Sequence, residues 1–423
     1  MKGIAQENYA YAPDELPMGG TIPSERLPEG MEMPRLFQPL ELTCGRKKMV
    51  LKNRVAAAPM CMYSSRDGFP TPFHVAHLGQ MVLHGVGTVL VEATAVSADG
   101  RISPNDMGIY KEEHVPAHAS LVASLKSMSG GVRVGIQLAH AGRKASTWPM
   151  VKTRASPSSP NVPVDQGGWE VVGPSPIPFG EKYLVPHELS YSQIRHLEDE
   201  FVRAADRAFR AGYDFVELHS AHGYLMSSFN SPMSNKRTDM YGGSFENRTR
   251  FLLNIVRRIR DQFPDKGLWI RLNGTDGMED AEEESWTVES TVELAPLLEE
   301  AGVDLLDLSS GGIGKEPSFA NKPGYQVPYS KAVKDLGLSR MHVSAVGALN
   351  FGTEEKPTMS GLFAEQMLQS NATDLVTIGR ALLGDPCWVE KAAENLTGVP
   401  CVHALQYIYG VGSLKKFTPG QPK

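Results

Sequence analysis

Short apolar runs recur along the chain at intervals that suit strands alternating with helices. Eight of them predict strands, at residues 54–60, 88–96, 133–140, 214–222, 268–274, 304–311, 342–348 and 374–381. Apolar runs of four to eight residues bounded by turn signals are typical of buried strands.

Between several of these runs, apolar residues recur every three or four positions, which predicts helices packed by one face. One such helix carries Ile194, Leu197, Phe201, Ala204, Ala205 and Ala208 and is followed by Gly212, a stop signal. In a second helix, Ser244 is the expected cap and Glu246 lies in the first turn. Its apolar face comprises Leu252, Ile255, Val256 and Ile259.

Strands that alternate with amphipathic helices imply parallel pairing through right-handed crossovers. Eight such units favour a (β/α)8 TIM barrel, and no GxGxxG follows the first strand to support an open dinucleotide-binding sheet. Residues 1–35, rich in Pro, Gly and charge, are expected to form an N-terminal extension, and residues 36–423 a single catalytic domain. A proline-rich insertion at 147–188 follows the third strand and is expected to wall the entrance of the site, together with "GYQVP" at 324–328.

Composition narrows the classes of function. A net charge of -6 and a pI near 6.1 argue against a nucleic-acid binder, which needs a positive field. The four cysteines, Cys44, Cys61, Cys387 and Cys401, form no CxxC pair, so neither a disulfide framework nor a clustered metal site is predicted. We find no signal-peptide pattern and no apolar stretch near the ~20 residues of a membrane helix, so we expect a cytoplasmic protein.

In a barrel of this kind the active site lies at the carboxyl ends of the strands. The fourth strand ends in "LHSAHGYLMSSF", which brings His219, His222 and Tyr224 together. A zinc site is one interpretation of the two histidines, but no HExxH motif or nearby carboxylate supports it. Another is that both are core histidines bound to backbone carbonyls.

The last two strands end in Gly347 and in Gly379 followed by Arg380. Loops after the seventh and eighth strands of such barrels recurrently bind phosphate, because glycine lets backbone N–H groups approach and a cation balances the charge. These residues therefore predict a cofactor that carries phosphate.

Several motifs, in this order, resemble the Old Yellow Enzyme family of FMN-dependent ene-reductases. They are "APMCMYS" (58–64), "VEATAV" (91–96), "GIQLAHAGRK" (135–144), "HSAHGYLMSSFNSPMSNKRTDMYGGSFENRTRF" (219–251) and "IGRALLGDP" (378–386). Cys61 and Tyr63 are similar to the thermophilic-like (class III) branch, and the long N-terminus to its fungal members. The resemblance implies noncovalent FMN, reduced by NADPH or NADH and reoxidised by an activated alkene such as an enone, enal or maleimide.

The resemblance also implies roles for individual residues. His219 and His222 would hold the carbonyl oxygen of the alkene, or a phenolic ligand, while hydride passes from flavin N5 to the β-carbon. Tyr224 would protonate the α-carbon; its alternative is a packing tyrosine. Cys61 would tune the flavin potential rather than act as a nucleophile, and Tyr63 would line the substrate pocket.

The remaining implied residues hold the cofactor. Ala58, Pro59, Met60 and Cys61 follow the first strand, Ala93 leaves room for the flavin ring, and Gln137 would pair with its pyrimidine edge. Arg271 would lie near flavin N1 and O2, with a structural ion pair as the alternative. Gly347, Gly379 and Arg380 would bind the phosphate.

The chain departs from the family at its C-terminus, where Tyr409 stands in place of an arginine that reaches a neighbouring subunit. A monomer and a homodimer both remain open. Two other functions also remain: a catalytically weak barrel that binds phenolic ligands, and a pathway-specific biosynthetic reductase or isomerase. A 2,4-dienoyl-CoA reductase is excluded, because that relative carries clustered cysteines and further domains.

Overall fold

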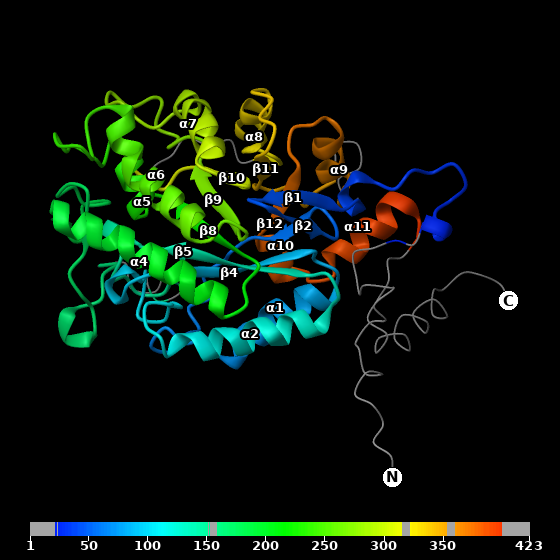
Figure 1. The fold of residues 1–423 in the computed structure, drawn as a ribbon, viewed down its shortest axis with the longest axis horizontal. Coiled ribbons are helices and arrows are strands. Elements are labelled where there is room, and N and C mark those ends of the chain that lie inside the picture. The colour runs from blue at the N-terminus through cyan, green and yellow to red at the C-terminus, as the bar shows by residue number, and fades with distance from the viewer. Residues whose placement is uncertain are drawn as a thin grey trace, which may run out of the picture.

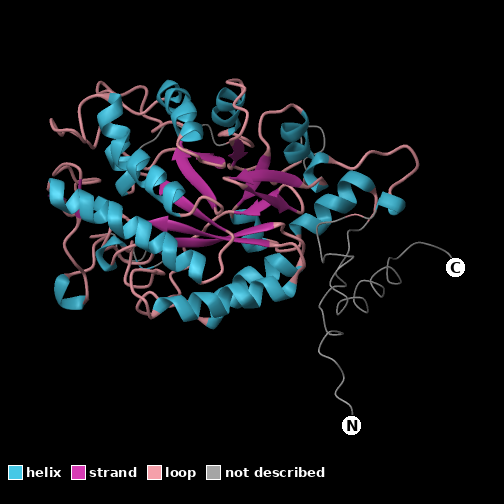
Figure 2. Cartoon of the chain, in the orientation of Figure 1, coloured by secondary structure: helices cyan, strands magenta, loops and turns pink. Residues whose placement is uncertain are grey.

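Eight parallel strands close into a barrel whose wall is covered by helices (Figures 1 and 2). The computed structural model describes residue 22 and residues 24–150, 152, 159–314, 322–352 and 360–399. The C-terminal segment with Cys401 and Tyr409 lies outside the described residues, so the expectation about Tyr409 stays a prediction.

The barrel order is β10-β11-β12-β3-β4-β5-β8-β9, and each neighbouring pair is parallel. The strands are β3 (Val55–Ala57), β4 (Thr88–Ala95), β5 (Arg133–Ala139), β8 (Phe215–Ser220), β9 (Gly267–Asn273), β10 (Leu305–Ser309), β11 (His342–Ala345) and β12 (Leu375–Ile378). Each lies within, or begins one residue before, a predicted run. The predicted (β/α)8 architecture is therefore confirmed.

The helices pack their apolar faces on the barrel, as the three-and-four spacing predicts. The longer ones are α1 (Pro72–Leu83), α2 (His114–Met128), α4 (Tyr191–Arg210), α6 (Phe245–Gln262), α7 (Val288–Glu300), α8 (Val327–Lys334), α9 (Leu362–Gln369) and α11 (Trp388–Thr397); α5 (Leu225–Asn230) and α10 (Arg380–Gly384) are short. Both predicted helix boundaries are confirmed. The Ser244 hydroxyl accepts the Asn247 N–H at the start of α6, and Gly212 follows α4 with φ 95°.

A hairpin that the run pattern did not predict closes the amino-terminal end of the barrel. Its strands, β1 (Leu40–Cys44) and β2 (Lys47–Leu51), are antiparallel. Leu40, Leu42, Cys44, Met49 and Leu51 are buried against the first residues of the barrel strands, where Phe215 and Trp269 stack with centroids 3.8 Å apart. The neighbouring strand carries Gly135, since a Cβ there would lie 2.2 Å from the Phe215 ring.

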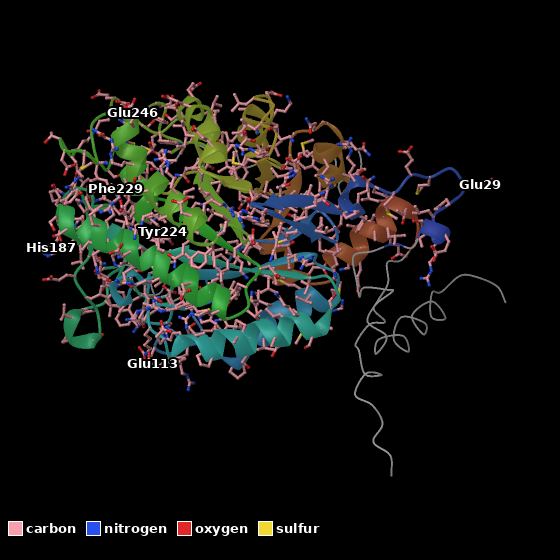
Figure 3. The ribbon with its side chains drawn as sticks, viewed as in Figure 1. Glu29, Glu113, His187, Tyr224, Phe229 and Glu246 are labelled. Carbon is pink, nitrogen blue, oxygen red and sulfur yellow. The ribbon has the colours of Figure 1, made fainter. Side chains whose placement is uncertain are left out.

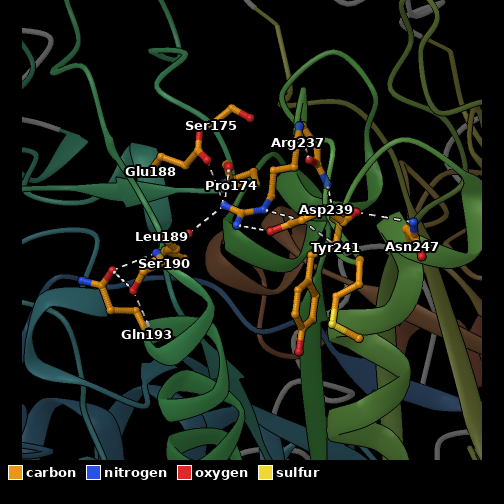
Figure 4. Close-up of polar contacts among 12 residues, drawn as sticks. Pro174, Ser175, Glu188, Leu189, Ser190, Gln193, Arg237, Asp239, Tyr241 and Asn247 are labelled. Atoms are coloured by element: carbon orange, nitrogen blue, oxygen red, sulfur yellow. Dashed lines mark hydrogen bonds and ion pairs between the residues drawn. The ribbon is translucent and has the colours of Figure 1, made fainter.

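The predicted insertion lies between β5 and α4, where it forms the short parallel pair β6 (Val172–Gly173) and β7 (His187–Glu188). Arg237, from the loop after α5, fastens it to the body (Figure 4). Its guanidinium donates to Pro174 O at 3.0 Å and Leu189 O at 2.7 Å and pairs with Asp239 at 2.6 Å. A buried arginine with these partners holds the ends of β6 and β7 in place.

The described end of the N-terminal extension packs on the barrel. Ile22 is buried in the main core cluster, and Leu27 and Met33 contact the same cluster. The backbone N–H groups of Arg35 and Leu36 donate to the Glu365 carboxylate of α9 at 2.9 and 2.8 Å. This part of the extension is therefore anchored before the barrel begins.

We expect the hairpin to be a required part of the fold. Leu42 is fully buried, so Leu42→Ala should lower the free energy of unfolding by about 2–5 kcal/mol, through lost burial and a residual cavity. Val50 lies on the exposed face of the same hairpin, so Val50→Ala should change it by no more than about 0.5 kcal/mol. Urea unfolding followed by circular dichroism measures both. Equal effects would show that the hairpin does not seal the barrel.

Candidate active site

A cavity of about 590 Å³ opens at the carboxyl ends of the barrel strands. Eight of the residues that the sequence predicted for the site line it: Ala58, Pro59, Met60, His222, Arg271, Gly347, Gly379 and Arg380. They come from the ends of five strands that are dispersed through the sequence. The volume falls in the range of about 300–1,000 Å³ that is usual for small-molecule sites.

The ends of β11 and β12 form one wall of this cavity. Gly347 has φ 112°, and a Cβ there would lie 2.7 Å from Gln326 Nε2, so no other residue fits without a shift. Beside it, a Cβ on Gly379 would make only ordinary contact with Ala58 and Met60, at 3.6 Å. The two glycines add no side chain to this wall, which leaves their backbone N–H groups open to a bound phosphate.

Sequence reasoning missed part of this wall. Tyr325, Gln326, Asn350 and Phe351 also line the cavity. Gln326 accepts from the Ser310 hydroxyl at 2.8 Å and donates to Val346 O at 3.3 Å. Tyr325 and Gln326 belong to "GYQVP", the segment that the sequence predicts at the substrate entrance; both lie in the cavity wall instead.

A buried polar layer crosses the barrel beneath the cavity. Gln137 of β5 donates to Glu217 of β8 at 2.8 Å, and Arg271 Nε of β9 lies 3.3 Å from Asp307 Oδ2 of β10. The ion pair offered as the alternative role of Arg271 is thus present, yet Arg271 also lines the cavity. Burial and the nearby Asp307 raise the pKa of Glu217 to about 8, so this carboxyl is protonated at neutral pH. Arg271 consequently faces only one carboxylate.

The histidine pair lies at the end of β8. His219 is buried, and its Nδ1 accepts the Ala221 N–H at 3.4 Å, which leaves the proton on Nε2. His222 has a left-handed backbone (φ 60°), its N–H donates to Asn273 Oδ1 at 3.0 Å, and its Nε2 contacts the Ser309 hydroxyl at 2.7 Å. The two rings meet edge to face, with centroids 5.2 Å apart.

Both imidazoles are held neutral. Burial lowers the pKa of His219 and His222, and the positive charges of Arg271 and Lys144 lower both further. The pair can therefore donate hydrogen bonds to an oxygen anion without itself becoming cationic. Ser309 closes its strand and was expected at the site, and it lines the cavity. Asn273 was not predicted, because it reaches His222 only through the barrel register.

Tyr224 caps the start of α5, and its ring lies edge-on to His219 at 4.9 Å. Figure 3 places it in the body of the molecule, away from outlying residues such as Glu113 and Glu246. Burial raises the pKa of the Tyr224 phenol, with smaller contributions from Cys61 and Tyr63. The hydroxyl therefore keeps its proton at neutral pH.

Lys144 lies beside this phenol. Its Nζ lies 5.2 Å from the Tyr224 ring centroid and donates to His222 O at 2.7 Å and Gly312 O at 3.0 Å. Burial lowers the pKa of Lys144 to about 7, with Arg143 adding to the effect. These bonds fix the left-handed turn at His222 and tie it to the loop after β10.

Cys61 and Tyr63 follow the first barrel strand. Tyr63 is left-handed (φ 53°), and burial raises its pKa. Burial also raises the pKa of the Cys61 thiol, followed by the effects of Asp106 and Glu92, so the side chain is a thiol and not a thiolate nucleophile. Ala93 is buried in β4, at the irregularity between Val91 and Thr94.

The residues present fit a flavin mononucleotide. The cavity has one glycine-lined wall, a buried cation in Arg271 and an exposed cation in Arg380. The buried Arg271 pairs through Nε with Asp307 and still lines the cavity, so its charge can act on a group bound there. The zinc interpretation of His219 and His222 finds no support. Among the described residues, one group of three His, Cys, Asp or Glu side chains converges closely enough to hold a metal ion, and it contains neither histidine.

Glu92 supplies a test of these electrostatics. Its carboxyl accepts a hydrogen bond from the N–H of Met62, the residue between Cys61 and Tyr63, at 3.2 Å. Burial raises the pKa of Glu92 from 4.5 to about 8. A raised folded-state pKa gives stability that is present below pH 4.5 and lost as the pH rises through 8. Glu92→Gln should therefore unfold with a weaker pH dependence than the wild type over this window. The exposed Glu170→Gln is the control, and parallel curves for wild type and Glu92→Gln would refute the assignment.

Comparison with known proteins agrees with the site. The sequence model of the NADH:flavin oxidoreductase / NADH oxidase family matches residues 35–398. The chain is 38% identical to NADH:flavin oxidoreductase FG08077 of Gibberella zeae, covering 91% of this chain and 90% of that protein. It is also 38% identical to an NADPH dehydrogenase of Bacillus velezensis, covering 86% and 96%.

Among solved structures, morphinone reductase superposes with a TM-score of 0.67 at 24% identity, covering 88% of this chain and 92% of that one. A 2-naphthoyl-CoA reductase gives a TM-score of 0.70 at 24% identity, covering 88% and 53%. These two show the shared fold. In the described residues, no helix is both long and apolar enough to span a bilayer. The chain therefore belongs to the NADH:flavin oxidoreductase / NADH oxidase family, the Old Yellow Enzyme family of NAD(P)H-linked oxidoreductases with noncovalent FMN.

Proposed function

We propose that this oxidoreductase reduces the C=C bond of α,β-unsaturated carbonyl compounds, such as enones, enals and maleimides. The observation that carries the proposal is the edge-to-face pair of neutral imidazoles beside a protonated phenol. A carbonyl oxygen that gains negative charge during reduction needs hydrogen-bond donors in a site shielded from water. His219 and His222 supply them.

FMN, when bound, supplies the hydride that the β-carbon receives, after reduction by NADPH or NADH. We assign its phosphate to Gly347, Gly379 and Arg380, and its ring to Ala58, Pro59, Met60, Cys61, Ala93 and Gln137. Arg271 would balance the negative charge of the reduced ring. It lines the cavity, and it lies directly beside His219 on the neighbouring strand.

Tyr224 is the proposed proton donor to the α-carbon. Its raised pKa keeps the proton in place until charge develops on the substrate next to it. Lys144, 5.2 Å away, stabilises the phenolate that remains after transfer. Tyr63 lies on the same side, and we assign it to the substrate pocket. Phenolic ligands would bind the same histidine donors through their oxygen.

The two half-reactions test the proposal separately. With the holoenzyme under anaerobic conditions, NADPH should bleach the visible flavin band and 2-cyclohexenone should restore it. Tyr224→Phe should leave the bleaching rate unchanged and slow the recovery by about 10²–10⁴-fold, the usual contribution of a general acid. Stopped-flow absorbance measures both rates.

Tyr191→Phe, at an exposed position on α4, is the matched control and should behave as the wild type in both steps. If FMN is bound and bleaches but the enone never restores the band, the enzyme does not reduce enones. Equal slowing of both half-reactions in Tyr224→Phe would assign this residue to cofactor placement instead of proton donation.

A further inference from the structure

Three side chains of the kinds that bind zinc converge away from the cavity, where the end of α1 meets the start of α11. His84 follows α1 directly, Cys387 precedes α11, and Glu390 lies in the first turn of α11. His84 Nδ1 lies 3.1 Å from Glu390 Oε1 and 3.5 Å from Cys387 Sγ. All three ligand atoms lie within 4.8 Å of one another.

These separations match the edges of a tetrahedral site. With zinc bonds of about 2.3 Å to sulfur and about 2.0–2.2 Å to nitrogen and oxygen, two ligands at a tetrahedral angle lie about 3.4–3.6 Å apart. The observed nitrogen–sulfur and nitrogen–oxygen distances, 3.5 and 3.1 Å, are close to these values. One ion can therefore reach all three atoms with small side-chain movements.

A catalytic thiol–imidazole–carboxylate triad is the competing interpretation, and the geometry opposes it. In such a triad the thiol and the carboxylate contact opposite nitrogens of the imidazole: one nitrogen takes the thiol proton, and the carboxylate orients the ring through the other. Here both contact Nδ1. Three ligand atoms around one point are the arrangement of a cation site.

The charges nearby agree with a cation. The carboxylates of Glu390 and Asp385 place negative charge beside the Cys387 thiol. His84 and Glu390 are partly exposed, at 21% and 12%, so an ion has a path from solvent.

We propose that His84, Cys387 and Glu390 form a site for one Zn²⁺ ion, with a water molecule as the fourth ligand. A ligand set of sulfur, nitrogen and oxygen favours zinc over Mg²⁺ and Ca²⁺, which prefer oxygen alone. The ion joins the start of α11 to the end of α1 and so stabilises the folded state.

Titration with Zn²⁺ tests the site, using holoenzyme whose thiols are reduced and whose bound metals have been removed with a chelator. We expect one Zn²⁺ per chain by calorimetry, and Co²⁺ should give the charge-transfer absorption of a thiolate ligand. Cys387→Ser and Glu390→Gln should each weaken Zn²⁺ binding at least about 100-fold, because losing even an outer partner of a metal ligand costs about 10–100-fold. Cys387→Ser should also abolish the Co²⁺ band.

Glu394→Gln, on an exposed position one turn along α11, is the control and should bind as the wild type. The flavin spectrum of each variant reports whether it has folded. Absence of stoichiometric binding to the wild type at micromolar Zn²⁺, or unchanged binding in Cys387→Ser and Glu390→Gln, would overturn the proposal. So would a loss of binding in Glu394→Gln equal to that in Glu390→Gln.

Discussion

Pairing of the last barrel strand with the first is the constraint on which the site depends. Val376 and Ile378 of β12 pair with Val55 and Ala57 of β3, and the Ala58 N–H donates to Ile378 O at 2.9 Å. This closure brings Gly379, at the end of β12, against Ala58, more than 300 residues earlier. Without it, the wall assigned to phosphate and the residues assigned to the flavin ring would lie on opposite edges of an open sheet.

Exclusion of water gives the enclosed residues their chemistry. Burial is the largest cause of the pKa shifts of His219, His222, Tyr224 and Cys61, and each shift favours the neutral form. These side chains therefore offer uncharged hydrogen-bond donors, while Arg271 places a buried positive charge on the cavity. Hydrogen bonds from neutral donors become stronger when negative charge develops on a bound oxygen, and they do so most where water is excluded.

The sequence predicts the barrel and most of the cavity because both follow from local patterns. Its apolar runs mark all eight strands, and the carboxyl ends of barrel strands meet at the site. The hairpin was missed because Leu40, Leu42 and Cys44 alternate with exposed residues and form no continuous run. The partners Asn273 and Asp307 were missed, and the contact of Ser309 with His222 was not foreseen, for another reason. Each acts across strands, and that register is set by three-dimensional pairing rather than by sequence spacing.

The measurement that tests the central claim most directly is the titration of the oxidised holoenzyme with 4-hydroxybenzaldehyde, followed by long-wavelength absorption. We predict a new band as the phenolate stacks on the flavin. We also predict an affinity at least about tenfold weaker in the His219→Ala/His222→Ala variant with FMN still bound, since a hydrogen bond to a charged group contributes about 1.5–3 kcal/mol. An unchanged affinity in that variant would contradict the assignment of the two histidines as the oxygen-binding pair.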